Sequence, residues 1–233
     1  YKISLVSKKT DNEIEGLLNE LIKHEDEDSF CNFCVNNFVK AALKFDTVIF
    51  NETYFNASQK YKAIEFYKKI MLPTFKKIGL FWLTNKMNPA QEHFLSEMFK
   101  QKIYSQINAE SEKKGNKQKN WVLFLPPNEH HEMGLLFTRY LLLSHGYNVI
   151  YLGANVPLLA LSEIVKCKEI DFTLFFVVSN FAKLNYKKTI QSVNKYFIKS
   201  KNYIVTNQTL NEDFIKENNV NLLQSVDDFL ELL

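Results

Sequence analysis

Two polar residues in one loop have the types and the spacing to form a metal ligand and its hydrogen-bond partner. The segment PPNEHHEMG, residues 126–134, follows a short apolar run. A metal-ligating histidine generally donates its second ring N–H to a carboxylate, which fixes the tautomer and raises the basicity of the ligating nitrogen. Glu129, two residues before His131, could supply that carboxylate, and Gly134 would let a flat ligand approach the backbone closely. The alternative is that His130 and His131 are ordinary polar loop residues.

An alternation of short apolar runs and amphipathic segments surrounds this loop. Strands are expected at about 121–125, 149–152, 172–178, 202–206 and 220–223, and helices at about 131–145, 157–168, 184–198, 211–217 and after Ser225. Such alternation predicts a parallel sheet covered by helices on both faces and built from five β/α units. Ligands of these sheets bind beyond the carboxyl ends of the strands, which is where residues 126–134 lie.

The first half of the chain predicts helices only. A capping box at residues 10–13 begins the first helix, and further helices are expected at about 28–43, 45–57 and 59–83. Asn88 can cap another helix, because Pro89 suits the first helical position and Gln91 the third position of a capping box.

A polar segment separates these two parts. Residues 111–119, with a glycine at 115, predict a linker. We therefore expect a helical-bundle domain at residues 1–114, followed by an α/β domain at residues 115–233.

Composition and charge argue against several classes of protein. The formal net charge is +3, from 29 basic and 26 acidic residues, which is too balanced to predict nucleic-acid binding. Arg139 is the only arginine, although recognition of phosphates and base edges usually depends on arginine. No signal peptide is visible and no apolar run is long enough to span a membrane, so a cytoplasmic chain is expected.

The cysteines predict no structural metal site. There are three, at positions 31, 34 and 167, and so sparse and odd a count favours a reducing compartment. Cys31 and Cys34 form a C-x-x-C pair, but the second pair or the nearby histidines that zinc would need do not follow. We interpret them as thiols on the core face of a helix, with a redox pair as the alternative.

The loop at 126–134 resembles the Asp/Glu-x-His-x-x-Gly motif of cobalamin-binding proteins such as methionine synthase and the mutases. In that family the histidine replaces the cofactor's own base as the lower axial ligand of cobalt. By position, Glu129, His131 and Gly134 take the three places of the motif, and His130 lies outside it. The resemblance implies that the α/β part is a Rossmann-like (flavodoxin-like) cobalamin-binding domain.

Two further segments are similar to that family. Gly153, Asn155, Val156 and Pro157 belong to what looks like its second loop, which packs against the corrin edge. Ser179 ends the third predicted strand, where the family usually has a serine that contacts the displaced dimethylbenzimidazole tail.

The chain departs from the family at two places near that tail. Asn180-Phe181 replaces the common continuation after the serine, and Thr206-Asn207 replaces a Gly-Gly pair that leaves room for the tail. We expect either a reshaped pocket, in which Asn207 and Gln208 add hydrogen bonds, or a lower affinity.

The helical part carries a second pattern. Trp82 is followed after nine residues by Glu92-His93, a spacing similar to the W-x9-E-H motif of the CarH/LitR photoreceptors, which are MerR-type regulators. In that family the tryptophan and glutamate lie on the upper face of the corrin, and the histidine takes the upper axial position after light. His93 would lie in the first turn of its helix, where the dipole disfavours an imidazolium. The alternatives are core packing for Trp82 and solvated first-turn polarity for the other two.

The resemblance implies a light-sensing module of a transcriptional regulator rather than an enzyme. Adenosylcobalamin would be the cofactor, a homotetramer in the dark the assembled form, and cleavage of its cobalt–carbon bond by light the signal. The segment Tyr1–Ser4 resembles the stretch that follows the DNA-binding domain in this family, so DNA would be contacted only through an upstream domain. No membrane partner is expected.

Two other functions stay open. A corrinoid methyl-carrier protein for a methyltransferase would share the architecture, and a ligand-free interaction module could have kept the fold. A stand-alone mutase is disfavoured, because no substrate barrel is present in the sequence.

Overall fold

The structure, a computed structural model, describes residues 27–84, 86–112, 118–207 and 209–233. It divides into two compact units, Tyr1–Met98 and Phe99–Leu233. The predicted capping box at 10–13 and the segment Tyr1–Ser4 lie outside the described residues. So does the centre of the predicted linker, and the domain boundary at 114/115 stays a prediction.

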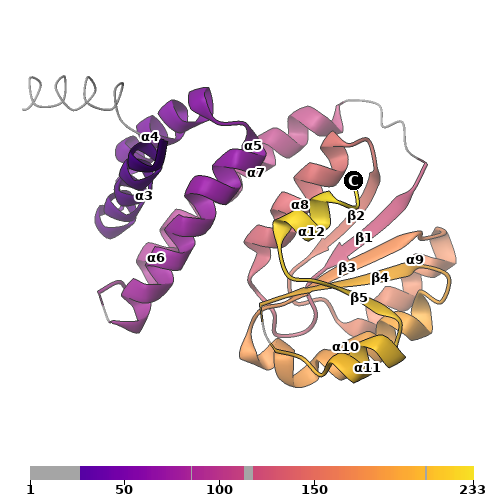
Figure 1. Cartoon of the computed structure of the whole chain (residues 1–233). Helices are drawn as coiled ribbons and strands as arrows, with labels where there is room; N and C mark the ends of the chain where they lie inside the picture. The colour runs from indigo at the N-terminus through magenta and orange to yellow at the C-terminus, as the bar shows by residue number, and fades with distance from the viewer. Residues whose placement is uncertain (1–26, 85, 113–117, 208) are drawn as a thin grey trace, which may run out of the picture. The chain divides into compact units, whose positions relative to one another are not determined.

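The described part of the first unit is helical, as the sequence predicts (Figure 1). Its helices are α3 (Glu27–Lys44), α4 (Thr47–Lys60), α5 (Ala63–Phe66), α6 (Leu72–Leu83) and the beginning of α7 (Pro89–Ser111), with a π-helical turn at Tyr67–Met71. The single helix expected at about 59–83 is therefore interrupted. Pro73 lacks a backbone N–H and crowds the carbonyl of the preceding turn, which accounts for the wider turn just before it.

Aromatic residues fill the interior of this unit. Phe38 and Phe50 are fully buried, and their ring centroids lie 5.1 Å apart across α3 and α4. Cys34 is buried beside them on α3, and burial is the largest of the causes that raise its pKa to about 12. Such a thiol is protonated at neutral pH, which confirms the interpretation of Cys34 as a core residue.

A reciprocal capping box begins α7, as predicted. The backbone N–H of Gln91 donates to Asn88 Oδ1 at 3.1 Å, and the Gln91 side chain accepts from the Asn88 N–H at 2.9 Å. The Gln91 amide also donates to the carbonyl of Leu43 at 3.0 Å, which ties the start of α7 to the end of α3. The geometry fixes the direction in which the first turn of α7 leaves the bundle.

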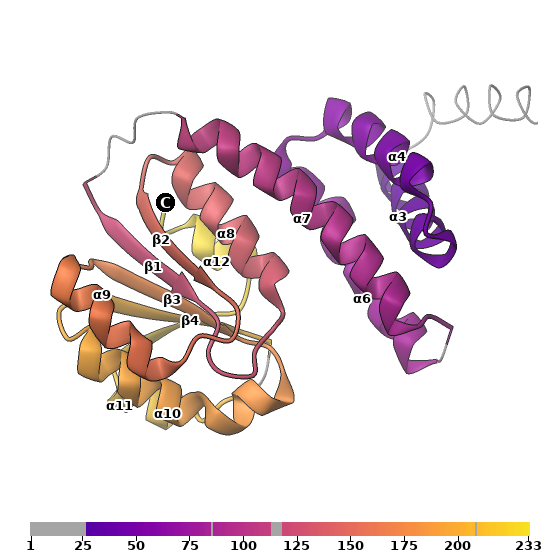
Figure 2. The same ribbon diagram turned by 180° about the vertical axis from the view of Figure 1, so that it is seen from behind.

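The second unit contains a five-stranded parallel sheet, which confirms the predicted α/β architecture. The strands are β1 (Asn120–Phe124), β2 (Asn148–Gly153), β3 (Phe172–Val177), β4 (Lys201–Thr206) and β5 (Val220–Leu223), in the spatial order β2-β1-β3-β4-β5. Figures 1 and 2 show α8 (Glu132–Ser144) and α12 (Val226–Leu230) on one face of the sheet. The other face is covered by α9 (Leu161–Cys167), α10 (Asn180–Tyr196) and α11 (Glu212–Glu217).

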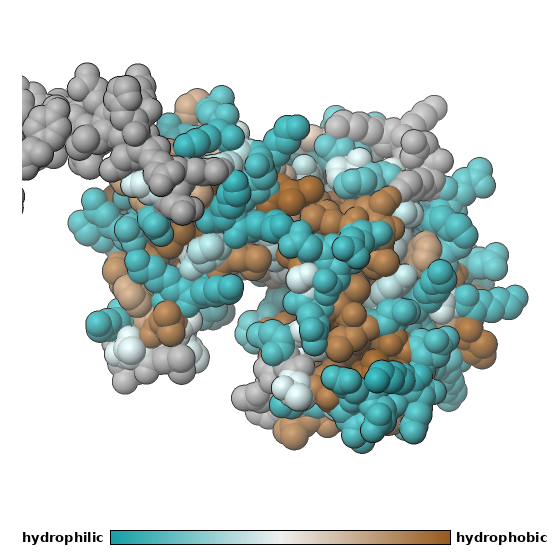
Figure 3. Space-filling model, viewed as in Figure 1, coloured by the Kyte–Doolittle hydropathy of each residue, from teal (hydrophilic) through white to brown (hydrophobic). Residues whose placement is uncertain are grey.

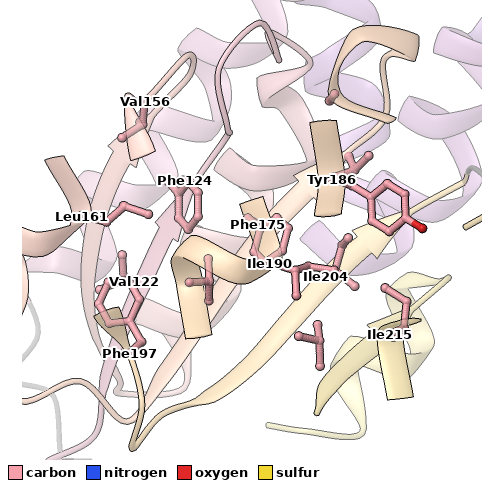
Figure 4. Packing of buried hydrophobic residues seen from close by; sticks show 14 of the residues in the cluster. Val122, Phe124, Val156, Leu161, Phe175, Tyr186, Ile190, Phe197, Ile204 and Ile215 are labelled. Carbon is pink, nitrogen blue, oxygen red and sulfur yellow. The ribbon is translucent and has the colours of Figure 1, made fainter. Parts of the chain in front are cut away.

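The core of this unit lies on both faces of β1, β3 and β4. On the side of α9, α10 and α11, Phe124 and Phe175 stack at 5.4 Å and pack against Tyr186 and Ile190 (Figure 4). The outward side of these helices is polar, and Figure 3 shows hydrophilic residues gathered over α10 and α11. Strands buried on both faces read as continuous apolar runs, which is why β3 was predictable from its sequence.

The strand order places a switch point between β1 and β3. β1 pairs with β2 on one side and β3 on the other, so the chains that leave β1 and β3 turn to opposite faces of the sheet. In this fold class such a switch point is where ligands bind.

Among the helices that the structure describes, none combines the length and the apolarity needed to cross a membrane.

Candidate functional site

Glu129 and His131 are in contact at the switch point. The distance from Glu129 Oε1 to His131 Nδ1 is 2.6 Å. The Glu129 side chain is fully buried, whereas 59% of the His131 side chain is exposed. His131 is the residue just before α8, so an exposed ring at the start of this helix is in contact with a buried carboxylate.

The buried carboxylate is held from two directions. Glu129 Oε1 also accepts the backbone N–H groups of His130 and His131, at 3.0 and 3.1 Å. Glu129 Oε2 accepts those of Val178 and Ser179, at the end of β3, at 2.8 and 2.7 Å. Burial acts to raise the pKa of Glu129, but the hydrogen bonds from the His131 ring and these amides outweigh it and lower the pKa to about 2. Glu129 is therefore ionised and joins the two sides of the switch point.

An ionised carboxylate at Nδ1 fixes the tautomer of His131. In the neutral ring the proton sits on Nδ1 and donates to Glu129, which leaves the lone pair on Nε2. That is the protonation state in which a histidine ligates a metal, and the carboxylate raises its basicity. Within the described ranges, no group of three or more His, Cys, Asp or Glu residues could hold a metal ion. The exposed His131 ring, with its carboxylate partner, could supply one protein ligand to a metal, as the cobalt of a corrin requires.

The loop after β2, residues 153–157, is hydrogen-bonded to the loop after β1, residues 126–131. Asn155 adopts a left-handed backbone conformation, with φ of 55°, and its side chain accepts the Asn128 N–H at 2.9 Å. The Asn155 N–H donates to the Glu129 carbonyl at 3.2 Å, and that of Val156 to the Leu125 carbonyl at 2.9 Å. The structure thus brings Asn155 and Val156 beside the candidate ligand.

The remaining residues of the second loop flank these contacts. Gly153 has a φ of 78°, and a Cβ there would lie 3.3 Å from Glu132 Oε1. Pro157 is exposed and precedes a 3-10 turn, Leu158–Ala160, so the helix predicted from 157 begins as a tighter turn. Contact of this loop with a corrin stays a prediction.

A polar cluster beside the site was missed by the sequence analysis. The Tyr151 hydroxyl donates to Glu132 Oε1 at 2.8 Å, and Lys100 Nζ lies 3.3 Å from Glu132 Oε2. The Arg139 guanidinium lies 5.0 Å from the centre of the Tyr151 ring. Burial, followed by the bond to Glu132, raises the pKa of Tyr151. These residues come from α7, α8 and β2, and no local spacing could have connected them.

Gly134 serves helix packing in this structure. A Cβ at this position would lie 2.7 Å from Cε1 of Phe176, so the Phe176 ring lies directly against the glycine backbone. The sequence analysis expected this space to be open to a flat ligand, and the structure fills it with a side chain of β3.

Two of the residues assigned to the cofactor's tail, Ser179 and Thr206, are engaged with the protein. Ser179 caps α10, where its hydroxyl oxygen accepts the Ala182 N–H at 3.1 Å, and α10 consequently begins four residues before the predicted position. Thr206 is buried, and its hydroxyl donates to the Val177 carbonyl at 2.6 Å. Asn207 is exposed, and Gln208 lies outside the described residues.

Trp82, Glu92 and His93 lie in the first unit, close to the turn that joins α6 and α7. Trp82 is 49% exposed, which contradicts plain core packing. It lines an open hollow of about 590 Å³, together with Lys86, Met87, Asn88, Pro89 and Gln91. Glu92 is half-buried and His93 exposed, both in the first turn of α7. The role of these residues toward a cofactor stays a prediction.

Comparisons with known proteins point to the same cofactor. Residues 35–105 match the family model described as B12 binding domain. The chain is also 27% identical, over 124 residues, to the HTH-type transcriptional repressor CarH of Myxococcus xanthus. That alignment covers 53% of this chain and 40% of the repressor, so the chain matches well under half the length of this relative.

The fold has a counterpart among solved structures. The monomethylamine corrinoid protein of Methanosarcina barkeri superposes with a TM-score of 0.66 at 14% sequence identity. The match covers 88% of this chain and 97% of that protein, which shows that both have the same fold. These comparisons support a cobalamin-binding domain in this chain, and the Glu129–His131 pair lies outside the residues that the family model matches.

Proposed function

We propose that this chain is the light-sensing, adenosylcobalamin-binding module of a transcriptional regulator, and that it catalyses no reaction itself. The observation that supports cofactor binding is the 2.6 Å contact between the buried Glu129 carboxylate and the exposed His131 ring. The observation that favours a sensor over other corrinoid proteins is the half-exposed Trp82 beside the turn that carries Glu92 and His93. Similarity to the HTH-type transcriptional repressor from Myxococcus xanthus agrees with a part in transcriptional regulation.

Each residue has a distinct role in this proposal. His131 ligates cobalt through Nε2, and Glu129 keeps the proton on Nδ1. The cofactor supplies a cobalt–carbon bond that light can break. Trp82 and Glu92 shield the upper ligand, and His93 supplies the nitrogen that takes its place after light. His93 is exposed in the first turn of α7, so its ring is accessible to a ligand.

The partners follow from the same proposal. The dark form assembles as a homotetramer, and loss of the upper ligand takes it apart. Contact with DNA is made by a separate domain, because this chain has a nearly balanced charge and a single arginine.

The central experiment follows absorbance and mass together. The chain is loaded with adenosylcobalamin in darkness, then illuminated, and its spectrum and light-scattering mass are recorded before and after. We expect a spectral change to a bis-histidine cobalt form and a fall in mass. An unchanged spectrum together with an unchanged mass would overturn the proposal.

Two pairs of variants assign the ligands. His131→Ala is expected to lower cofactor affinity by at least about tenfold, whereas the adjacent His130→Ala, outside the motif, leaves it unchanged. His93→Ala is expected to keep dark binding and the dark mass, but to give a photoproduct without the second histidine ligand. Equal loss of binding in His130→Ala and His131→Ala would show that the pair in contact is not the ligand pair.

A corrinoid methyl carrier is the alternative, because the Glu129–His131 pair would serve it equally well. It predicts tighter binding of methylcobalamin than of adenosylcobalamin, and transfer of the methyl group when a methyltransferase is added. Illumination would then leave the mass of the loaded chain unchanged.

A further inference from the structure

The space beside Gly134 is closed by the protein itself. Phe176 is 9% exposed, and its ring lies so near that a single added carbon at Gly134 would be 2.7 Å from Cε1. A methyl group cannot enter here unless the ring moves. An aromatic base, which is far larger, would need Phe176 to leave its position in β3 altogether.

The end of β4 is closed in the same way. Thr206 is 3% exposed, and its hydroxyl donates to the Val177 carbonyl at 2.6 Å. Two glycines here would leave both a side-chain volume and a carbonyl available to a ligand. In this chain the threonine fills the volume and binds the carbonyl.

Ser179, which the resemblance also assigns to the tail, is occupied in helix capping. Its hydroxyl oxygen accepts the Ala182 N–H at 3.1 Å, and its own N–H is held by Glu129 at 2.7 Å. Turning the hydroxyl toward a ligand would remove the cap of α10. Of the residues that the resemblance assigns to the tail, Ser179 and Thr206 are therefore engaged inside the protein, and Asn207 is exposed.

The mismatch is confined to the tail. The lower-ligand pair is complete, since Glu129 and His131 are in contact. The second loop is also fixed to the first through Asn155. The domain can therefore present a cobalt ligand although the slot for the nucleotide base is filled.

We propose that this chain holds the corrin ring through His131 and leaves the nucleotide tail outside the domain, so that it favours corrinoids without a lower base. This inference rests on the proposed cofactor binding. In cobalamin, the bond between cobalt and the cofactor's own base must break as the bond to His131 Nε2 forms. In cobinamide only a water molecule leaves, and in neither case is anything oxidised or reduced.

The direction of the preference follows from that exchange. On the lower face of the corrin, only the form of cobalamin with its base detached can accept His131, and the apparent dissociation constant for that face rises as this fraction falls. A tail slot would offset this loss by binding the detached base, but Phe176 and Thr206 fill the slot. We expect aquocobinamide to bind at least about tenfold more tightly than aquocobalamin.

The test titrates the full chain with aquocobinamide and with aquocobalamin, and follows the absorbance of the histidine-ligated cobalt. His131→Ala should abolish this absorbance change with both compounds. The control His130→Ala should retain it with both. Tighter binding of aquocobinamide supports the inference. Equal or tighter binding of aquocobalamin overturns it and leaves the proposed function standing, whereas a lack of His131-dependent binding of either compound overturns both.

A variant that opens the slot provides the second arm. Phe176→Ala removes the ring beside Gly134. We expect it to lower the ratio of the dissociation constant of aquocobalamin to that of aquocobinamide by about tenfold. Phe175→Ala is the matched control, because Phe175 lies on the opposite face of β3 and loses an equal volume without opening the slot. The same change in the ratio of these two dissociation constants for both variants would overturn the inference. If Phe176→Ala fails to fold, the ratio measured in the unaltered chain still decides between support and refutation.

Discussion

At the scale of single residues, Glu129 connects the chemistry of the site to the stability of the sheet. Its carboxylate is fully buried and accepts four backbone N–H groups and one ring N–H. Two of the amides come from the loop after β1 and two from the end of β3. One charged group thus orients the candidate cobalt ligand and joins the strands on either side of the switch point.

The pH dependence of folding should reveal this residue. The pKa of Glu129 is lowered from 4.5 to about 2, so its contribution to stability is complete above pH 4.5 and is lost as the pH falls toward 2. We expect Glu129→Gln to cost about 3 kcal/mol near neutral pH, and this difference from the unaltered chain to shrink to less than half at about pH 3. Urea unfolding at a series of pH values measures it.

Glu217→Gln is the control, because Glu217 is exposed near the end of α11. It should change the stability little at any pH. A Glu129→Gln variant whose stability runs parallel to that of the unaltered chain at all pH values would contradict the role assigned to the carboxylate.

Sequence reasoning reached part of this arrangement. Glu129 and His131 are two residues apart in one loop, so their contact could be anticipated from chemistry alone. The amides of Val178 and Ser179 are about 50 residues further along the chain, and nothing local marks them as partners of Glu129. Phe176 is equally remote from Gly134, which is why a glycine expected to admit a ligand proves to be covered.

At the scale of elements, helix caps and strands could be predicted from the sequence, but the order of the strands in the sheet could not. The box formed by Asn88 and Gln91 is local, and the structure has both of its hydrogen bonds. Alternation of strands and helices predicts a parallel sheet whatever the strand order. The order β2-β1-β3-β4-β5 depends on which helices cover which face, and that is decided by long-range packing.

The cap of α7 is expected to matter beyond its own two bonds. Asn88→Ala should lower the free energy of unfolding by about 1 kcal/mol, because the Gln91 N–H loses its acceptor. Asn88→Ser, which can still cap a helix, should recover most of that loss. Denaturant unfolding of the two variants measures the difference, and equal stability of both would show that the cap contributes nothing.

At the scale of the whole molecule, the proposed ligands of the cofactor come from both compact units. Trp82, Glu92 and His93 belong to the first, and His131 to the second. Each unit has its own buried core, so each can unfold as a separate step. A cofactor that binds residues of both units must stabilise both, and one that binds only His131 must stabilise the second alone.

Thermal unfolding separates these cases. We expect two calorimetric transitions in the cofactor-free chain. Tryptophan fluorescence can assign each transition to a unit, because each unit holds one of the two tryptophans, Trp82 and Trp121. In Trp121→Phe the remaining fluorescence comes from Trp82 and follows the first unit alone. Adenosylcobalamin in darkness, at about 100 times its dissociation constant, should add about 2.7 kcal/mol in total and raise both transitions. After illumination, the cofactor should no longer raise the transition temperature of the first unit in His93→Ala. It should still raise that of the second unit, since His131 still ligates cobalt. A rise confined to the second transition in darkness would mean that the helical unit does not touch the upper ligand, and would favour the methyl carrier over the light sensor.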